Sequence, residues 1–317
     1  MTDLEFIEQF ESCRFRYEEW THEAHLRMGW YYLSHLGLRI ATEKVRSGIQ
    51  RLNSIIGVKG RGYHETITCF YLRVLDREVL RTNFREWADF LNKNPSLLDT
   101  SLLSQYYSDQ LLNSERARTD FLLPDQKNLP SLSLSIRDLN EDDFEIIDSY
   151  WKTLGQDDLQ RMYIDPSKLV FGKAFRERFI SMLHTPKSES KQDSLIWEVE
   201  KKVIGMVKLK YDGEHGNPRI HLHIFDRRYQ GRSLGSWFFV ESCLEFMKRF
   251  QIELLHCEPA TTNLYPNRLL QKLQIPLERS YHGINSPICF EQPVNSYAIH
   301  KYYLLEAKVK ITNNNEV

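Results

Sequence analysis

The spacing of apolar residues changes near residue 124 and predicts two different architectures. Before this point, apolar positions recur at intervals of three and four, which is typical of amphipathic helices. The segments that carry this pattern are 20–36, 41–56, 64–80, 85–91 and 97–103. Few residues in this part of the chain alternate with period two. Residues 1–123 are therefore expected to form an all-helical domain.

After residue 131, short alternating runs are interspersed with helical segments. Strands are expected at 132–136, 194–199, 203–209, 219–225, 252–258, 280–282 and 297–304. Helices are expected at 142–154, 171–183, 234–250 and 267–273. This order of strands and helices predicts an α/β domain with a mixed sheet flanked by helices, covering residues 132–317. The whole chain is thus expected to combine an all-α domain with an α/β or α+β domain.

A linker is expected between the two parts. Pro124 and Pro130 enclose a polar stretch that contains Gln126, Lys127 and Asn128. Prolines with polar residues between them are typical of connecting segments. We therefore expect residues 124–131 to join two separable domains.

Composition narrows the classes of protein. The net charge of −1 gives no indication of a nucleic-acid or membrane surface. The five cysteines are widely spaced and form no CxxC pair, so neither a disulfide framework nor a zinc knuckle is indicated. The sequence shows no signal-like start, and no apolar run approaches the roughly 20 residues that span a bilayer. We expect a cytoplasmic protein, and the oligomeric state stays open.

The most informative segment is the strand at 219–225, which leads into a loop of small residues and then into the helix at 234–250. Gly231, Ser233 and Gly235 are closely spaced just before this helix. Such a loop exposes successive backbone N–H groups at a helix N-terminus, where the helix dipole also favours an anion. The sequence therefore predicts a site for a phosphate or pyrophosphate.

This loop resembles the acyl-CoA pyrophosphate loop of the GNAT N-acyltransferases, whose pattern is Arg/Gln-x-x-Gly-x-Gly/Ala. Gln230 fills the first position and Gly235 the last, whereas Ser233 replaces the usual middle glycine. The order of elements over about residues 132–305 also resembles this family. The resemblance implies that acetyl-CoA, or another acyl-CoA, is the co-substrate. The residues then expected to bind it are Ile224, Phe225, Gln230, Gly231, Arg232, Ser233, Leu234, Gly235 and Ser236.

A second match follows in the fifth strand and the next helix. Asn263 and Lys272 hold the positions of two further cofactor-binding residues of the family. Leu270 occupies the position where many members carry a tyrosine that acts as general acid. Three possibilities follow: the reaction proceeds without this acid, another residue such as Tyr265 replaces it, or turnover is impaired.

Within the family, the sequence is most similar to siderophore-type lysine N-acyltransferases. His221 lies nine residues before Gln230, as their strand histidine does, and Glu258 keeps the Glu-Pro of their next motif. The resemblance implies that His221 is the catalytic base and Glu258 its acidic helper. Ala260 replaces the aspartate expected there. Period-two alternation places His221 and His223 on one face of the strand. A merely structural role remains open for both histidines.

Three histidines of the helical part form a second candidate group. His22 and His25 are three residues apart on one helix face, and His64 and Glu65 open another helix. If these helix starts were adjacent, they could bind Zn²⁺ or Fe²⁺; otherwise they cap the helices. We assign no metal site. The surrounding runs resemble uncharacterised bacterial helical proteins, from which no function transfers.

Three functions are compatible with these patterns. The first is an acyl-CoA-dependent N-acyltransferase that modifies an amine of a small molecule or peptide. The second is a CoA-binding sensor with a degenerate active site, which the residues Leu270, Ala260 and Ser233 favour. The third is a metal-dependent enzyme in the helical part. The acceptor is expected to contact variable segments at 155–190 and 277–292.

Overall fold

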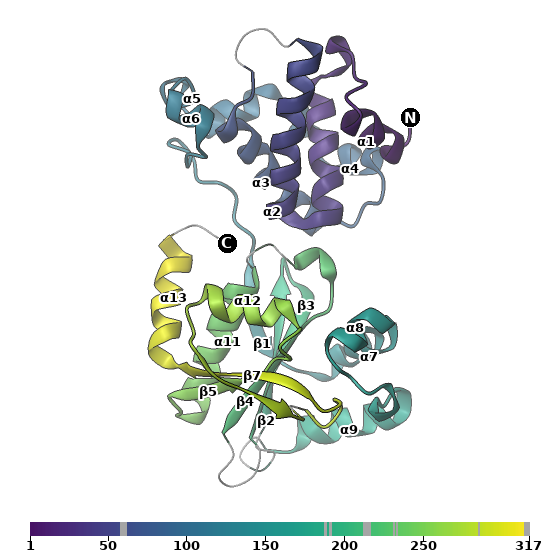
Figure 1. The fold of residues 1–317 in the computed structure, drawn as a ribbon, viewed down its shortest axis with the longest axis vertical. Coiled ribbons are helices and arrows are strands. Elements are labelled where there is room, and N and C mark those ends of the chain that lie inside the picture. Colours follow the sequence, from purple (N-terminus) through teal and green to yellow (C-terminus); the bar gives the residue numbers. More distant parts are fainter. Residues whose placement is uncertain are drawn as a thin grey trace. The chain divides into compact units, whose positions relative to one another are not determined.

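The computed structural model describes residues 1–57, 62–186, 189, 192–211, 217–230, 232, 234–284 and 286–313. The chain forms two compact units (Figure 1). The helical unit comprises Met1–Leu132 together with Arg228–Arg232, and the sheet unit comprises Ser133–Arg227 and Ser233–Val317. Within the described part of the chain, none of the helices is long and apolar enough to cross a membrane.

The helical unit is built around two long helices that pack against each other. Its helices are α1 (Asp3–Glu11), α2 (His22–Ile56), α3 (Glu65–Arg81), α4 (Trp87–Lys93), α5 (Asp109–Leu112) and α6 (Glu115–Thr119). Leu33, Leu52 and Phe90 are completely buried in its core. The all-helical prediction is therefore confirmed. Residues Thr100–Gln105 form a 3₁₀ helix where a short helical segment was expected.

Helix α2 contains two helices that the sequence predicted separately, and it kinks at Gly37 between them. The Gly37 backbone has φ 72° and ψ 164°, which is non-helical and lies in a region that essentially only glycine adopts. The segments predicted at 20–36 and 41–56 are thus the two arms of a helix that kinks at this residue.

The sheet unit contains seven strands in the order β1-β2-β3-β4-β5-β7-β6. The strands are β1 (Leu134–Asp138), β2 (Gln192–Val199), β3 (Lys202–Tyr211), β4 (Pro218–Ile224), β5 (Leu254–Cys257), β6 (Leu277–Gly283) and β7 (Gln292–His300). Its helices are α7 (Phe144–Thr153), α8 (Gln156–Arg161), α9 (Gly172–His184), α11 (Leu234–Phe250), α12 (Leu264–Lys272) and α13 (Lys301–Asn313). Neighbouring strands are antiparallel except β4 and β5, which are parallel. The predicted mixed sheet with flanking helices is confirmed.

The sheet's two faces carry separate apolar layers because side chains alternate along each strand. On one face, Trp197 of β2 stacks on Phe238 of α11 with ring centroids 5.2 Å apart, and its indole nitrogen donates to Ser242. On the other face, Ile196 packs in a cluster with Phe144 of α7 and Phe179 of α9. The sheet is thus covered by helices on both sides (Figure 1).

The prediction of a strand over 297–304 is wrong in its second half. Strand β7 ends at His300 and α13 begins at Lys301. Leu304, Ala307 and Ile311 are buried at helical spacing. The strand is followed directly by the first turn of the helix, without a loop between them. The sequence pattern therefore did not show where the strand ends.

Residues of the expected linker contact the helical unit. The Asp125 carboxylate accepts a hydrogen bond from the backbone N–H of Ser108, and Leu129 packs against the cluster around Phe70. The division at 124–131 into separable domains stays a prediction.

Candidate functional site

The parallel strands β4 and β5 separate near the centre of the sheet. Strand β4 pairs with β3 from Pro218 to Ile224, but its only paired position with β5 in the described chain is Arg219 with His256. The following residues of β4 therefore run beside an opening in the sheet. A strand edge at such an opening presents backbone donors and acceptors to a ligand.

Ile224 and Phe225, both expected to bind the cofactor, direct their backbone N–H groups to opposite sides of β4. The Phe225 N–H donates to the Ile204 carbonyl at 2.8 Å, so it is used within the sheet. In an antiparallel pair, successive N–H groups point to opposite sides, and Ile224 is paired with Gly205. The Ile224 N–H therefore points toward the β5 side. The Phe225 N–H is thus used within the sheet, and the cofactor-binding roles of Ile224 and Phe225 stay predictions.

Gly205 allows the close approach of β3 and β4 at this point. A Cβ atom on Gly205 would lie 2.4 Å from the His223 carbonyl oxygen. Any larger residue would push the strands apart beside the Ile224 donor.

The predicted phosphate loop lies where expected, between β4 and α11. A 3₁₀ turn covers Arg227–Tyr229, Gln230 lies in a turn, and α11 begins at Leu234. Leu234 and Ser236 are buried, whereas a Cβ added to Gly235 would meet no atom within 4 Å. Gly231 and Ser233 lie outside the described residues, so their predicted role stays untested.

Arg232 has a different environment from the one expected of a phosphate ligand. Its side chain is only 1% exposed and forms an ion pair with Asp76 of α3. It also donates to the Leu33 carbonyl at 2.7 Å. Nearby, the Tyr229 hydroxyl donates to the Leu80 carbonyl at 3.0 Å. The Arg232 guanidinium is thus used inside the helical unit, and only its backbone is left for the predicted cofactor contact.

His221 and His223 share one face of β4, as the alternation predicts. The Tyr150 hydroxyl hydrogen-bonds to Nδ1 of His223 at 3.1 Å, and the Trp151 ring lies 4.9 Å from the imidazole. Burial lowers the pKa of His223 to about 4, so this ring is neutral at pH 7. These contacts favour a structural role for His223. His221 is half-buried, and its catalytic role stays a prediction.

Glu258 is buried just after β5, where its carboxylate interacts with residues of β4 and β6. Its Oε2 atom lies 3.0 Å from Nε of Arg219 on β4. Burial, and then the Glu258 charge, raises the pKa of Tyr281 on β6 above its usual value. Glu258 therefore takes part in an ion pair, and its proposed assistance to His221 stays a prediction.

Asn263 lies in a polar network that the sequence patterns did not reveal. The Arg161 guanidinium of α8 donates to its Oδ1 atom at 3.1 Å and to Asp158 at 2.9 Å. Arg227, in the 3₁₀ turn after β4, pairs with the same Asp158 carboxylate. Arg161 also lies 5.1 Å from the centroid of the exposed Tyr265 ring. The i,i+3 spacing of Asp158 and Arg161 is the only local sign of this network.

Asn267 of α12 holds the turn that carries Asn263. Its amide nitrogen donates to the carbonyls of Ala260 and Asn263 at 2.9 and 2.7 Å. Its Oδ1 atom accepts from Tyr297 at 3.0 Å. Because Asn267 is buried, these bonds fix the turn relative to β7. Further along α12, Leu270 is fully buried.

Lys272, the second predicted cofactor-binding residue after the fifth strand, lies exposed at the C-terminal end of α12. Its predicted role stays a prediction.

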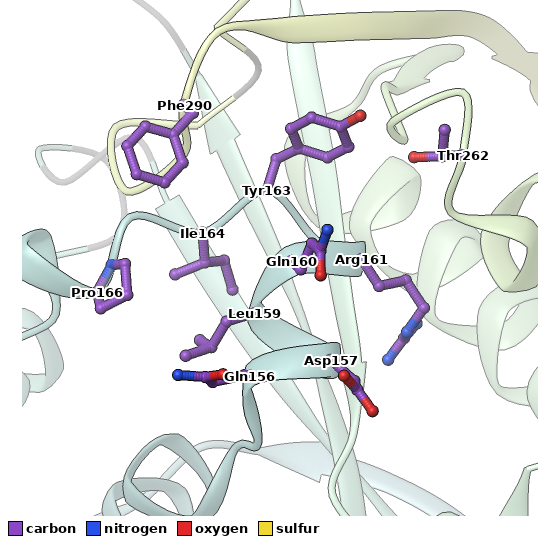
Figure 2. Close-up of a pocket in the computed structure, with 10 residues that line it drawn as sticks. All are labelled: Gln156, Asp157, Leu159, Gln160, Arg161, Tyr163, Ile164, Pro166, Thr262 and Phe290. Carbon is purple, nitrogen blue, oxygen red and sulfur yellow. The ribbon is translucent and has the colours of Figure 1, made fainter.

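A pocket of about 690 Å³ adjoins this network (Figure 2). It is lined by Gln156, Asp157, Leu159, Gln160, Arg161, Tyr163, Ile164, Pro166, Thr262 and Phe290. The segments expected to contact the acceptor are joined here, since the Phe290 N–H donates to the Tyr163 carbonyl at 2.8 Å. Tyr163 has φ 52°, an uncommon conformation for a bulky residue. Strain of this kind is often found at ligand sites.

His22, His25 and His64 of the helical unit do not form the metal site considered above. The Nε2 atoms of His22 and His64 hydrogen-bond to the carbonyls of Leu97 and Leu112, and Nδ1 of His25 to that of Thr21. Within the described residues, no three His, Cys, Asp or Glu side chains are grouped as metal ligands. Of the two alternatives, capping and backbone contacts therefore explain these positions.

Comparison of the sequence with models of known families finds no match, and comparison with curated proteins finds none. Solved structures with a similar fold include a ribosomal L7/L12 alpha-N-protein acetyltransferase in complex with coenzyme A, at 13% identity and TM-score 0.45, covering 54% of this chain and 95% of that one. A spermidine N-acetyltransferase from Vibrio cholerae in complex with CoA and spermine matches at 15% identity and TM-score 0.44, covering 54% and 98%. Likenesses at this level do not assign the chain to a family.

Proposed function

We propose that the chain is an acyl-CoA-dependent N-acyltransferase that modifies an amine of a small molecule or peptide in the cytoplasm, with acetyl as the simplest acyl group. The observation that carries this proposal is the separation of the parallel strands β4 and β5 immediately before the loop and α11. The order of elements in the sheet unit also agrees with the order implied by the sequence resemblance.

The reaction requires a neutral amine, a bound thioester and a donor for the developing oxyanion. The amine nitrogen attacks the thioester carbonyl carbon, the carbon–sulfur bond breaks, and the proton lost by the amine is available to the leaving thiolate. His221 is the proposed base, directly or through water. The Ile224 N–H is the proposed oxyanion donor. The amides of residues 231–236, at the start of α11, are proposed to hold the pyrophosphate.

Of the three possibilities for the missing tyrosine, we propose that another residue protonates the leaving thiolate. Leu270 is fully buried, and its alkyl side chain has no acidic proton to donate. Tyr265 is 56% exposed and lies beside Arg161 and Asn263. Its hydroxyl is therefore our candidate for the acid that protonates the leaving thiolate.

The pocket beside α8 is the proposed acceptor site. Its apolar side chains Leu159, Ile164 and Phe290 favour a hydrophobic body on the acceptor, and Asp157 and Thr262 offer polar contacts at its rim. Figure 2 shows Phe290, Ile164 and Leu159 on one side of the view and Thr262 on the other.

The test is a screen of amines by release of free CoA from acetyl-CoA, detected with a thiol reagent. The proposal expects release that depends on both the amine and the protein. The screen covers polyamines, amino acids and peptide N-termini. If the protein binds CoA but none of these amines causes release of free CoA from acetyl-CoA, the CoA-binding sensor is favoured instead. The buried Leu270 and Ala260 are the observations that favour that second function.

A further inference from the structure

Strands β3 and β4 of the sheet unit bring four basic side chains to one face of the sheet. Lys208 is paired with His221, and Lys210 is paired with Arg219. Paired residues of an antiparallel ladder point to the same side of the sheet, with Cβ atoms about 4.5–5.5 Å apart. Lys208 is therefore the direct cross-strand neighbour of His221, the proposed base. We name these four residues the basic cluster.

The basic cluster lies where the opening between β4 and β5 begins. Arg219 and His256 form the only pair between these two strands in the described chain. His221 is the next residue of β4 on the same face, so it lies beside the opening. A molecule that approaches the opening on this face therefore meets His221 and, across from it, Lys208.

The charge of Lys208 is not balanced by a neighbouring acid. Its Nζ atom lies 3.8 Å from the uncharged Sδ atom of Met182 on α9, and the residue paired with Lys208 on β2 is Ser194. The next residue of β2, Asp193, is used elsewhere, because it forms an ion pair with Arg249 of α11. Within the described residues, no carboxylate forms an ion pair or a hydrogen bond with the Lys208 ammonium.

This environment favours an anion that a ligand supplies. Burial, and then the charge of Lys210, lowers the pKa of Lys208 below its ordinary value. A half-buried ammonium without a carboxylate has lost part of its hydration and gained no ion pair in return. The nearby Glu258 carboxylate does not meet this need, since it pairs with Arg219. A carboxylate on a bound ligand would compensate the charge.

We propose that Lys208 binds a carboxylate that the acceptor carries beside its amine, which makes the acceptor an α-amino acid. In an α-amino acid a single carbon atom joins the two groups, and this arrangement suits the directly opposed side chains of His221 and Lys208. The inference rests on the proposed function, because it places the acceptor amine at His221. Lys208 thereby determines specificity and takes no part in the proton transfer.

The experiment measures calorimetric affinities of the full chain for the standard α-amino acids and for their α-amides. Each amide keeps the side chain and the amine but lacks the charged carboxylate. The amino acid that binds most tightly should bind about tenfold more tightly than its amide, as expected for one charge-assisted contact. Release of CoA from acetyl-CoA is measured with the same pairs of compounds.

Three variants assign the preference to one side chain. Lys208→Met, which keeps the length of the side chain and removes its charge, should reduce the preference to about twofold or less. Lys208→Arg should keep part of it. Lys173→Met is the matched control and should keep the full preference, because Lys173 is an exposed lysine of α9 that pairs with Glu177.

The outcomes separate this proposal from the proposed function. If the amides bind and release CoA as well as the amino acids do, the acyltransferase stands and the carboxylate site is wrong. If Lys208→Met retains the preference, the carboxylate is recognised elsewhere and the proposal is overturned. If the amino acids bind in a Lys208-dependent manner without release of CoA, the carboxylate site stands and the acyltransferase fails. If none of the amino acids binds, the proposal is overturned, whatever the screen of other amines shows.

Discussion

At the scale of single residues, His221 and His223 show how neighbouring histidines on one strand acquire different properties. His223 is fixed by Tyr150 and stays neutral, whereas His221 lies at the position proposed for the base. His221→Ala should lower kcat by about 10²–10⁴-fold, the usual contribution of a general base, and leave CoA affinity nearly unchanged. Steady-state kinetics and calorimetry measure the two quantities.

The control for this variant is His223→Gln, which keeps a polar partner for Tyr150 and should affect kcat far less. In the wild type, the rate should fall at acid pH along a limb that His221→Ala removes. Near-normal kcat in His221→Ala would make the histidine structural, and desolvation of the acceptor amine would then replace general-base catalysis.

The half-buried His25 and His223 predict how the free energy of unfolding depends on pH. Burial lowers the pKa of both His25 and His223 to about 4 in the folded chain, from the ordinary value of 6.5. Between pH 4 and 6.5 the unfolded state therefore binds more protons, so the free energy of unfolding should fall as the pH decreases through this window. Urea denaturation at pH 7, 6 and 5 should show a shallower pH dependence in His25→Gln. An unchanged slope in both His25→Gln and His223→Gln would contradict this explanation.

Part of the candidate site was predictable from the residues. The position of the loop and the shared face of His221 and His223 follow from local patterns. The contact of Arg161 with Asn263 joins residues 102 positions apart, and no local spacing predicts it. The hydrogen bond from the Phe225 N–H to the Ile204 carbonyl likewise depends on the register of β3 against β4, which local spacing does not predict.

At the scale of elements, the kink in α2 depends on one glycine. Gly37 has a backbone conformation that essentially only glycine adopts, whereas Gly57 lies in the left-handed region that other residues tolerate at moderate cost. Gly37→Ala should therefore lower the free energy of unfolding by about 2–3 kcal/mol, and Gly57→Ala by about 1 kcal/mol. Chemical denaturation of both variants tests this order. Equal stabilities of Gly37→Ala and the wild type would show that the kink does not require glycine.

Strongly patterned elements were predictable, and weakly patterned ones were not. Helix α11 begins and ends at the predicted residues, because an apolar helix follows a loop of small residues. The predicted hairpin of β2 and β3 is also present. Its Glu200 and Lys201 adopt the positive φ of a tight turn. Helix α8 (Gln156–Arg161) was missed because it is short and mostly polar.

At the scale of the whole molecule, the helical unit supplies partners for residues that precede α11. Arg232 pairs with Asp76, and Tyr229 donates to Leu80, although the sequence predicted separable domains. A chain beginning at Ser131 would leave the Arg232 guanidinium without these partners. We therefore expect this shortened chain to bind CoA at least about tenfold more weakly than the full chain, as calorimetry would measure. Equal affinity would show that the loop is organised without the helical unit.

The central claim is that acyl-CoA binds at the start of α11, and Gly235 offers the most direct test. A Cβ at this position meets no atom within 4 Å, so Gly235→Leu should fill the ligand's space without disturbing the fold. In thermal-shift titrations, CoA at a hundredfold excess over Kd should stabilise the wild type by about 2.7 kcal/mol. The control Lys248→Leu, an exposed position at the other end of α11, should keep this stabilisation, and Gly235→Leu should lose it. An unchanged CoA stabilisation in Gly235→Leu would place the CoA site elsewhere and contradict the proposed function.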